Sequence, residues 1–366
     1  MKNYKYLIIP TILFSLQLTS CNKNKELFVI PPVEEGKVQI HSVIQRVFLN
    51  GPLEDVNLYV NGSEELSRPQ DISFSWPNEF NQDCTLHLSE NKDYSDSVEY
   101  QVGNRNRISF NNLKIGTTYY FFVDTPNNEI IYEESFTVSS EIIRNMYISG
   151  VTNARDLGGY PISGNRTLNQ GLIYRTGRLN ENDEEEVVNK ITNNGISTMV
   201  NDLKIKSEID LRRVDNNEVG GLTEGIGVLG DTVSYYQCPM DYSYDFMGGE
   251  LNDSSLRKLF TILGNKDNYP LFFHCSIGTD RTGYVAYLIN AFLGVSEEHL
   301  YRDYLFSNFG NIGGKRSISS IENNYPAVIK QYKGDNLQEK AKNYLLDKGI
   351  KQEELNTLKE MMIPER

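Results

Sequence analysis

One short segment of the sequence combines a nucleophile with groups that can hold a phosphate. Residues 273–283 read FHCSIGTDRTG, so that the five residues 276–280 separate Cys275 from Arg281. A loop of this length can curl until its backbone N–H groups point inward, and the guanidinium of Arg281 adds a bidentate donor. The pattern predicts a phosphate-binding loop made by Ser276, Ile277, Gly278, Thr279, Asp280 and Arg281.

Cys275 is the candidate nucleophile of this loop. Positive groups near a thiol lower its pKa, and a thiolate can attack phosphorus in line, giving a phospho-cysteine that water later hydrolyses. The hydroxyl of Thr282 can donate to the thiolate, and we expect His274 to fix the loop and tune the thiol rather than act as a base. The sequence has no second His or Cys cluster at ligand spacing, so we expect no metal and no cofactor.

Elements on both sides of the loop must position it. Residues 271–273 (LFF) are wholly apolar, which is typical of a strand buried on both faces of a parallel sheet. Residues 284–293 predict a helix that Gly294 ends, and its positive end would face the loop. Strands alternating with helices before a helical tail predict an α/β fold with a central, mostly parallel sheet. Further helices are expected at 181–194, 255–263, 296–306, 316–331, 337–348 and 352–362.

The N-terminal half has a different pattern. From about residue 38 to 138, alternating runs such as 72–76 (ISFSW) and 85–88 (TLHL) are separated by turn-rich stretches. Short strands at regular spacing predict an all-β sandwich. We therefore expect a separate β-domain at 38–140 that contributes no catalytic residue.

The N-terminus has the features of an export signal. Lys2 and Lys5 precede an apolar run at 6–18 (YLIIPTILFSLQL), and residues 18–21 read LTSC. This ending resembles a bacterial lipobox, which implies removal of residues 1–20 and lipid attachment at Cys21, with residues 21–37 as a tether. The alternative is an ordinary secretory signal. Either way we expect an exported protein, and a lipid would anchor it to a bacterial membrane on the periplasmic or cell-surface side.

Composition narrows the possible partners. The formal net charge is -13, with 39% hydrophobic and 23% charged residues, as in a soluble globular protein. Nucleic acid is a poor partner for so acidic a chain, because its phosphates are held by clustered Lys and Arg. A phosphorylated substrate would need a strong local site. Of the four cysteines, lipidation of Cys21 would leave three, so at least one thiol would stay without a disulfide.

The loop segment resembles the signature of the protein tyrosine phosphatase superfamily. More narrowly, the chain resembles a bacterial tyrosine phosphatase family related to secreted mycobacterial phosphatases with lipid activity. The supporting phrases follow in family order across about residues 145–363: NARDLGGY at 153–160, GLIYRTG at 171–177, DLR at 210–212 and YRDYLFSN at 301–308. The resemblance implies a catalytic domain at 145–366, supporting roles for Arg155 and Asp156, and hydrolysis of phosphomonoesters.

A second resemblance concerns the N-terminal half. Residues 108–123 are similar to the fibronectin type III pattern, in which a Leu, a Gly and a Tyr form a corner before a late strand. Trp76 corresponds to the buried tryptophan of an early strand in such domains.

The general acid has more than one candidate. In most of the superfamily this acid is an Asp on a loop upstream of the cysteine, and Asp241 lies 275 − 241 = 34 residues upstream, with Asp245 nearby. Asp280, directly before the loop arginine, resembles the acid assigned in myotubularin-like lipid phosphatases. Asp280 is our first choice and Asp241 stays open, while Asp280 could instead be a structural carboxylate bonding loop amides or Arg155.

The substrate also stays open between a phosphorylated protein, phosphotyrosine first, and a phosphoinositide. Relatives with lipid activity often carry a Lys where this chain has Thr279, which weakens the lipid alternative. Tyr242 and Tyr244 could pack against an aromatic phosphoester. A rhodanese-like sulfurtransferase and a catalytically degenerate surface-binding module are remote alternatives, which the intact Cys275 and Arg281 disfavour.

Overall fold

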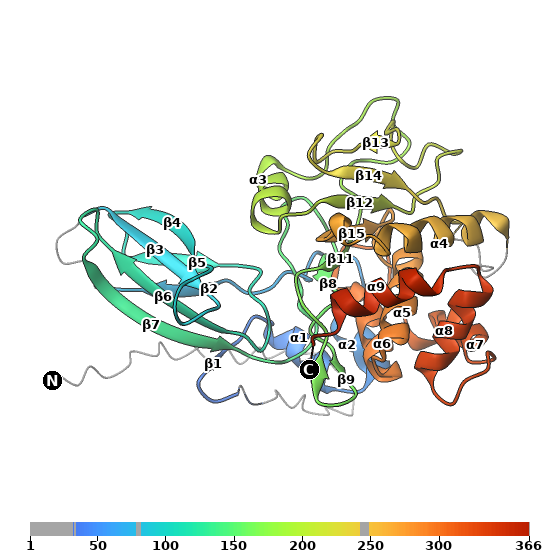
Figure 1. Cartoon of the computed structure of the whole chain (residues 1–366), viewed down its shortest axis with the longest axis horizontal. Coiled ribbons are helices and arrows are strands. Elements are labelled where there is room, and N and C mark those ends of the chain that lie inside the picture. Colours follow the sequence, from blue (N-terminus) through green and yellow to red (C-terminus); the bar gives the residue numbers. More distant parts are fainter. Residues whose placement is uncertain (1–31, 33, 78–81, 242–248, 366) are drawn as a thin grey trace, which may run out of the picture.

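The computed structural model describes residues 32, 34–77, 82–241 and 249–365. Two parts lie side by side, a β-rich part with strands β1 to β7 and a larger part in which helices cover a second sheet (Figure 1). Within the described residues, no helix combines the length and apolarity of a membrane span.

In the described N-terminal half, two sheets share one hydrophobic core. Burial alternates along β6, so Tyr119, Phe121 and Val123 face this core as the period of a strand requires. Trp76 is also buried there, and the Tyr119 hydroxyl accepts a hydrogen bond from the Lys114 N–H at 2.9 Å. The fibronectin type III likeness and the 38–140 boundaries stay predictions. The first sheet has the order β1-β7-β6-β3-β4, from Lys37–Val38, Ile130–Val138, Thr118–Asp124, Cys84–Ser89 and Val98–Gly103, and the second pairs β2 (Ile72–Ser75) with β5 (Arg107–Phe110).

The β prediction is wrong for residues 43–59, which form α1 (Val43–Asn50), a 3-10 turn (Leu53–Asp55) and α2 (Val56–Tyr59). A capping box begins α1, because the Ser42 hydroxyl accepts the Gln45 N–H while the Gln45 side chain accepts the Ser42 N–H. Phe48 of α1 is fully buried, with its ring centroid 5.6 Å from that of Phe309. This segment therefore belongs to the core of the C-terminal half.

A six-stranded sheet organises the C-terminal half. Its order is β13-β14-β12-β15-β11-β8, in which the four inner strands are parallel and the two edge strands are antiparallel to their neighbours. The predicted central, mostly parallel sheet is confirmed. The bounds are β8 Arg155–Asp156, β11 Ile173–Thr176, β12 Ser207–Asp210, β13 Gly225–Ile226, β14 Ser234–Gln237 and β15 Leu271–His274, and β9 (Pro161–Ile162) pairs with β10 (Arg166–Thr167) in a separate hairpin.

Both faces of the inner strands are buried, which explains the wholly apolar run in β15. Leu271 and Phe273 pack in the larger hydrophobic cluster with the C-terminal helices, while Phe272 points into a second cluster with Met199 and Ile205. Figure 1 shows α3 on one side of this sheet and α4 to α9 gathered on the other. The helices are α3 (Asn193–Ser197), α4 (Glu250–Leu263), α5 (Asp280–Leu293), α6 (Glu297–Phe306), α7 (Tyr325–Ile329), α8 (Leu337–Asp347) and α9 (Gln352–Met362).

Two helix predictions are wrong over most of their length. Residues 181–192 form turns and bends, and the helix begins only at Asn193. Within 316–331, regular helix is limited to a 3-10 turn (Ile318–Ser320) and α7. In both segments side chains bind distant partners, Asn182 with Ser276 and Arg316 with Asp280, and such contacts override local propensity.

Candidate active site

Cys275 lies directly after β15, at the edge where the parallel strands end. The last residue of that strand, His274, pairs with Thr176 of β11 and Asp210 of β12. The loop 275–279 then leads into α5, whose first residue is Asp280. The predicted arrangement of strand, loop and helix is therefore confirmed.

Donors from outside the loop hold its carbonyl groups. The Ser276 carbonyl accepts from the N–H and the guanidinium of Arg178, both at 3.3 Å. The Asn153 amide donates to the carbonyls of Ile277 and Gly278, and Arg175 donates to that of Gly278 at 2.7 Å.

This clamping orients the amides of the loop. In a planar trans peptide the C=O and the following N–H point in opposite directions. The N–H groups of residues 277, 278 and 279 therefore turn away from the clamping donors, toward the concave side of the loop. Gly278 has φ of +70°, and a Cβ there would lie 2.5 Å from the Thr176 carbonyl oxygen, so only glycine fits.

Two cysteines in this half are equally buried and differ in acidity. Burial raises the pKa of Cys238 to about 12. Burial also acts to raise the pKa of Cys275, but the positive charge of Arg281 and hydrogen bonding from Thr282 outweigh it and lower that pKa below its ordinary value. The Thr282 hydroxyl has no hydrogen bond of ordinary geometry among the described residues, so we give it a smaller part than Arg281. Neither Cys238 nor Cys275 is in a disulfide.

Several hydrogen bonds hold the guanidinium of Arg281 in place. One terminal nitrogen lies 2.6 Å from a carboxylate oxygen of Glu218 and also donates to the carbonyls of Leu211 and Met240, each at 3.3 Å. The other terminal nitrogen donates to the Ser276 hydroxyl at 3.3 Å. Both charged side chains are nearly buried, at 5% exposed for Arg281 and 11% for Glu218.

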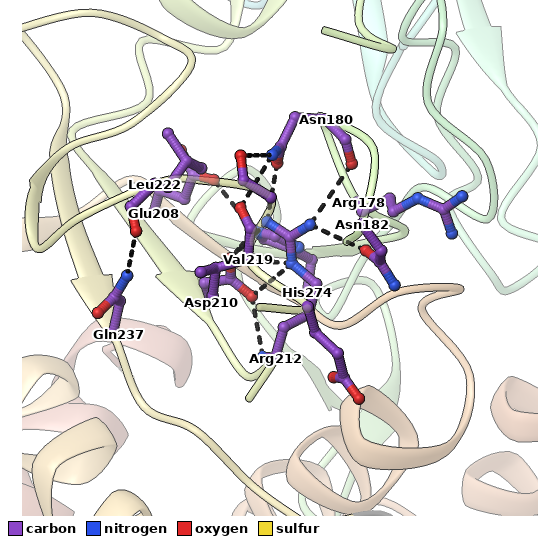
Figure 2. Close-up of polar contacts among 12 residues, drawn as sticks. Arg178, Asn180, Asn182, Glu208, Asp210, Arg212, Val219, Leu222, Gln237 and His274 are labelled. Atoms are coloured by element: carbon purple, nitrogen blue, oxygen red, sulfur yellow. Dashed lines mark hydrogen bonds and ion pairs between the residues drawn. The ribbon is translucent and has the colours of Figure 1, made fainter. Parts of the chain in front are cut away.

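A network of buried polar side chains contacts the loop, and its members are drawn in Figure 2. Arg212 lies at its centre and binds both oxygens of Asp210, the side-chain oxygen of Asn180 at 2.8 Å and that of Asn182 at 3.1 Å. Asn182 in turn donates to the Ser276 hydroxyl at 2.9 Å, which links the network to the loop.

His274 belongs to the same network. Its Nε2 lies 3.0 Å from Glu208 and its Nδ1 3.3 Å from the Cys275 carbonyl oxygen. Burial acts to lower the pKa of His274, but the carboxylates of Asp210 and Glu208 outweigh it and raise that pKa. The side chain has no exposed surface, which agrees with an anchoring role rather than proton transfer to a substrate.

The two described candidates for the general acid have different surroundings. Arg316 donates to both carboxylate oxygens of Asp280, at 3.1 and 2.9 Å, and the Tyr304 hydroxyl donates at 3.2 Å. Asp241 is 41% exposed and its carboxylate lies 3.6 Å from Arg213. The expected partner of a structural Asp280, Arg155, is replaced by Arg316. Asp245, Tyr242 and Tyr244 lie outside the described residues.

Arg155 and Asp156 act one layer further from the loop. Arg155 binds Asp303 at 2.7 Å, and the other oxygen of Asp303 binds Arg175, which clamps the loop. Asp156 instead pairs with Arg144 at 2.7 Å. Their predicted supporting roles thus concern the scaffold of the site.

Sequence reasoning missed Glu218, Arg178 and Asn182, which directly contact the loop or its arginine. Glu218 and Arg178 lie in polar, turn-rich stretches, and Asn182 lies in the segment 181–194 that the sequence predicts as a helix, so no local signal distinguishes them. In the described chain, a cavity of about 350 Å³ beside the loop is lined in part by Ser276 and Ile277, whereas a larger one of about 760 Å³ lies at the C-terminal helix near Lys359.

Comparison with known proteins agrees with this geometry. Residues 146–364 match the model of the tyrosine phosphatase family. A protein of Cupriavidus necator that is named as a tyrosine-protein phosphatase is 28% identical over 171 residues, which cover 44% of this chain. The match spans 62% of that relative, less than two thirds of its length.

Two solved structures are more distant. The catalytic core of the PP-IP phosphatase Siw14 from S. cerevisiae is 20% identical, with 49% of this chain and 93% of that chain covered and a TM-score of 0.28. P. aeruginosa TpbA in complex with phosphotyrosine is 12% identical, with 52% and 86% covered and a TM-score of 0.26. At such TM-scores these likenesses carry no argument about this chain.

Proposed function

Since this chain belongs to the tyrosine phosphatase family and is a cysteine-type phosphatase, we propose that it hydrolyses phosphotyrosine in proteins with Cys275 as the nucleophile. The observation that carries the proposal is a loop whose carbonyls are held by outside donors, which turns the following amides toward its concave side. Arg281 acts on the thiol of this loop and lowers the pKa of Cys275. The name of the family and of the C. necator relative support phosphotyrosine as the first substrate.

The reaction proceeds in two displacement steps. The Cys275 thiolate attacks phosphorus, the S–P bond forms, and the P–O bond to the leaving group breaks. Water then attacks the phospho-cysteine, the S–P bond breaks, and inorganic phosphate leaves with the thiolate regenerated. In both steps the loop amides and Arg281 stabilise the charge on the equatorial phosphate oxygens.

We assign proton donation to Asp241. The assignment is supported by the hydrogen bond from Arg281 to the carbonyl of Met240, the residue directly before Asp241. Both oxygens of Asp280 are already engaged by Arg316. Asp241 would protonate the leaving oxygen in the first step and take a proton from water in the second. This choice differs from our first choice on the sequence, because the contacts of Asp280 with Arg316 and Tyr304 favour a structural role for Asp280.

Hydrolysis of p-nitrophenyl phosphate tests the proposal. We expect turnover by the purified protein, inhibition by vanadate, and loss of activity in Cys275→Ser. Cys238→Ser is a matched control, because Cys238 is equally buried and belongs to no part of the loop. An inactive wild-type protein, or an active Cys275→Ser variant, would disprove the proposal.

A phosphoinositide is the alternative substrate, which a comparison of turnover on phosphotyrosine peptides, phosphoserine peptides and phosphoinositide vesicles would resolve. Higher kcat/KM on the vesicles would favour the lipid.

The cellular setting is a separate proposal. The run at 6–18 and the LTSC phrase support export, with lipid attachment at Cys21, although residues 1–31 lie outside the described residues. We propose a lipid-anchored phosphatase. Cys21→Ala should leave the membrane fraction, and its recovery there at wild-type levels would contradict lipidation.

A further inference from the structure

The cavity of about 350 Å³ beside the catalytic loop is a second feature of this site. Ser276 and Ile277, the two residues after the nucleophile, form part of its lining. The Ser276 hydroxyl accepts a hydrogen bond from Arg281, so Ser276 contacts the phosphate-binding arginine and also lines this cavity. A group bound here would be close to a phosphate held in the loop.

Three cations line the cavity: Arg68, Arg178 and Lys190. Arg178 and Lys190 share the carboxylate of Glu181, at 2.8 and 3.0 Å. The other terminal nitrogen of Arg178 donates to the Ser276 carbonyl. A terminal guanidinium nitrogen carries two N–H groups and an ammonium carries three, so both side chains keep donors for a ligand.

Arg68 reaches the cavity from outside the region that matches the family, in residues 61–68, which we call the strap. Its guanidinium lies 4.8 Å from the centre of the Tyr147 ring, a cation–π contact that orients it. No hydrogen bond of the Arg68 side chain occurs within the described residues.

Backbone bonds fix the strap on the catalytic half. The N–H of Gly62 donates to the Asn308 carbonyl at 2.9 Å, and that of Leu66 to the Phe309 carbonyl at 2.6 Å. Gly62 has φ of +73°, and a Cβ there would lie 2.5 Å from the Gly314 carbonyl oxygen, so the close approach requires glycine. Arg68 is thus held at the cavity by a segment that is itself anchored.

We propose that Arg68, Arg178 and Lys190 form a second phosphate-binding subsite, and that the substrates of this enzyme carry a second phosphate near the one that is cleaved. The inference rests on the proposed phosphatase function and adds the substrate class to it. Three cations, two of them planar guanidinium groups that keep N–H donors, suit a dianionic phosphate group better than a ligand with a single carboxylate.

Two carboxylates lie close to the three cations. Glu181 is shared by two of the cations, while Glu65 lines the cavity and accepts hydrogen bonds from the hydroxyls of Ser67 and Thr152. The balance of three cations against two carboxylates is positive in a chain whose net charge is -13. Such a local excess is what an anionic second group would require.

The test compares phenyl phosphate with the ortho, meta and para phenylene bisphosphates. We expect Lys190→Ala and Arg68→Ala each to lower kcat/KM for the best bisphosphate on the order of tenfold, chiefly through KM, because each removes one charged hydrogen bond. Activity on phenyl phosphate should stay within about twofold of wild type. Lys92→Ala, which removes an exposed cation from the turn between β3 and β4, is the matched control. It should leave kcat/KM unchanged for both substrates.

Equal losses on both substrates, or no loss on either, would overturn the subsite while leaving the phosphatase function intact. Binding of the bisphosphate to Cys275→Ser, with and without Lys190→Ala, reports on the subsite even in the absence of turnover, and unchanged affinity would also refute it. A peptide phosphorylated on two adjacent tyrosines forms a second arm. If the variants lose kcat/KM only on this peptide, the second phosphate belongs to a protein substrate. If they lose kcat/KM only on the phenylene bisphosphates, it belongs to a small molecule.

Discussion

The carboxylate of Glu218 lies 2.6 Å from the guanidinium of Arg281, 63 residues away in the sequence. This pair fixes the phosphate-binding arginine before any substrate arrives. We expect Glu218→Ala to lower kcat/KM for p-nitrophenyl phosphate on the order of tenfold, because Arg281 would lose its orientation. Asp215→Asn, at an exposed carboxylate of the same loop, should have little effect.

The same pair predicts a pH dependence of stability. Burial acts to raise the pKa of Glu218, but Arg281 outweighs it, so the pKa is lowered in the folded protein. The stability that Glu218 contributes is therefore full above its unfolded pKa and is lost as pH falls through the folded value. The free energy of unfolding of wild type should exceed that of Glu218→Gln at neutral pH, and the difference should shrink in acid. A difference that grows in acid would contradict the assignment.

Acidity of the nucleophile can be measured by alkylation. Thr282→Ala removes one group that favours the Cys275 thiolate, so the pKa of Cys275 should rise and the pH profile of iodoacetamide labelling should move toward alkali. Cys275→Ser identifies the labelled thiol. An unchanged midpoint would show that Arg281 and the loop amides suffice.

Asp241 and Asp280 are distinguished by the leaving group. We expect Asp241→Asn to lower kcat/KM on the order of a hundredfold with phenyl phosphate, whose leaving group needs a proton, and far less with p-nitrophenyl phosphate. The ratio kcat/KM reports on the first displacement alone, whereas kcat also includes the second step, in which Asp241 takes a proton from water. Asp280→Asn, which breaks the contact with Arg316, should affect both substrates alike. The reverse pattern would assign the proton to Asp280.

Asp303 should be among the most sensitive positions for stability. Its carboxylate binds the fully buried Arg155 and Arg175 at once. Asp303→Ala would leave two buried guanidinium groups without a counterion, at a cost of about 3–5 kcal/mol in the free energy of unfolding. Urea denaturation measures this, with the exposed Asp335→Ala as a control expected to stay within about 0.5 kcal/mol of wild type.

Local patterns predicted the parts of the site that depend on neighbours in sequence. The apolar run before Cys275 predicted β15, because a strand buried on both faces requires apolar residues throughout. Gly294 predicted the end of α5, because a left-handed C-cap favours glycine. The contacts that shape the loop could not be predicted in this way. Glu218 and Arg316 reach it from turn-rich segments, and their roles depend on how distant parts of the chain meet.

The same reasoning explains the wrong helices. The acidic residues at the start of 181–194 have the composition of a first helical turn, yet Asn182 binds Ser276 and Arg212, which lie outside this segment. Such tertiary contacts outweigh helix propensities, which amount to only a few tenths of a kcal/mol per residue.

The burial of Phe48 among the rings of Phe306 and Phe309 has a consequence for how this protein can be divided and how it can diverge. A catalytic fragment that started at Met146 would expose the apolar surface of Phe306 and Phe309 that Phe48 covers. It would also lose the hydrogen bond from Arg302 to the backbone of α1. Such a fragment should aggregate rather than turn over substrate. Substitutions at Phe48, Phe306 and Phe309 should therefore covary among homologues, because the three rings pack against one another.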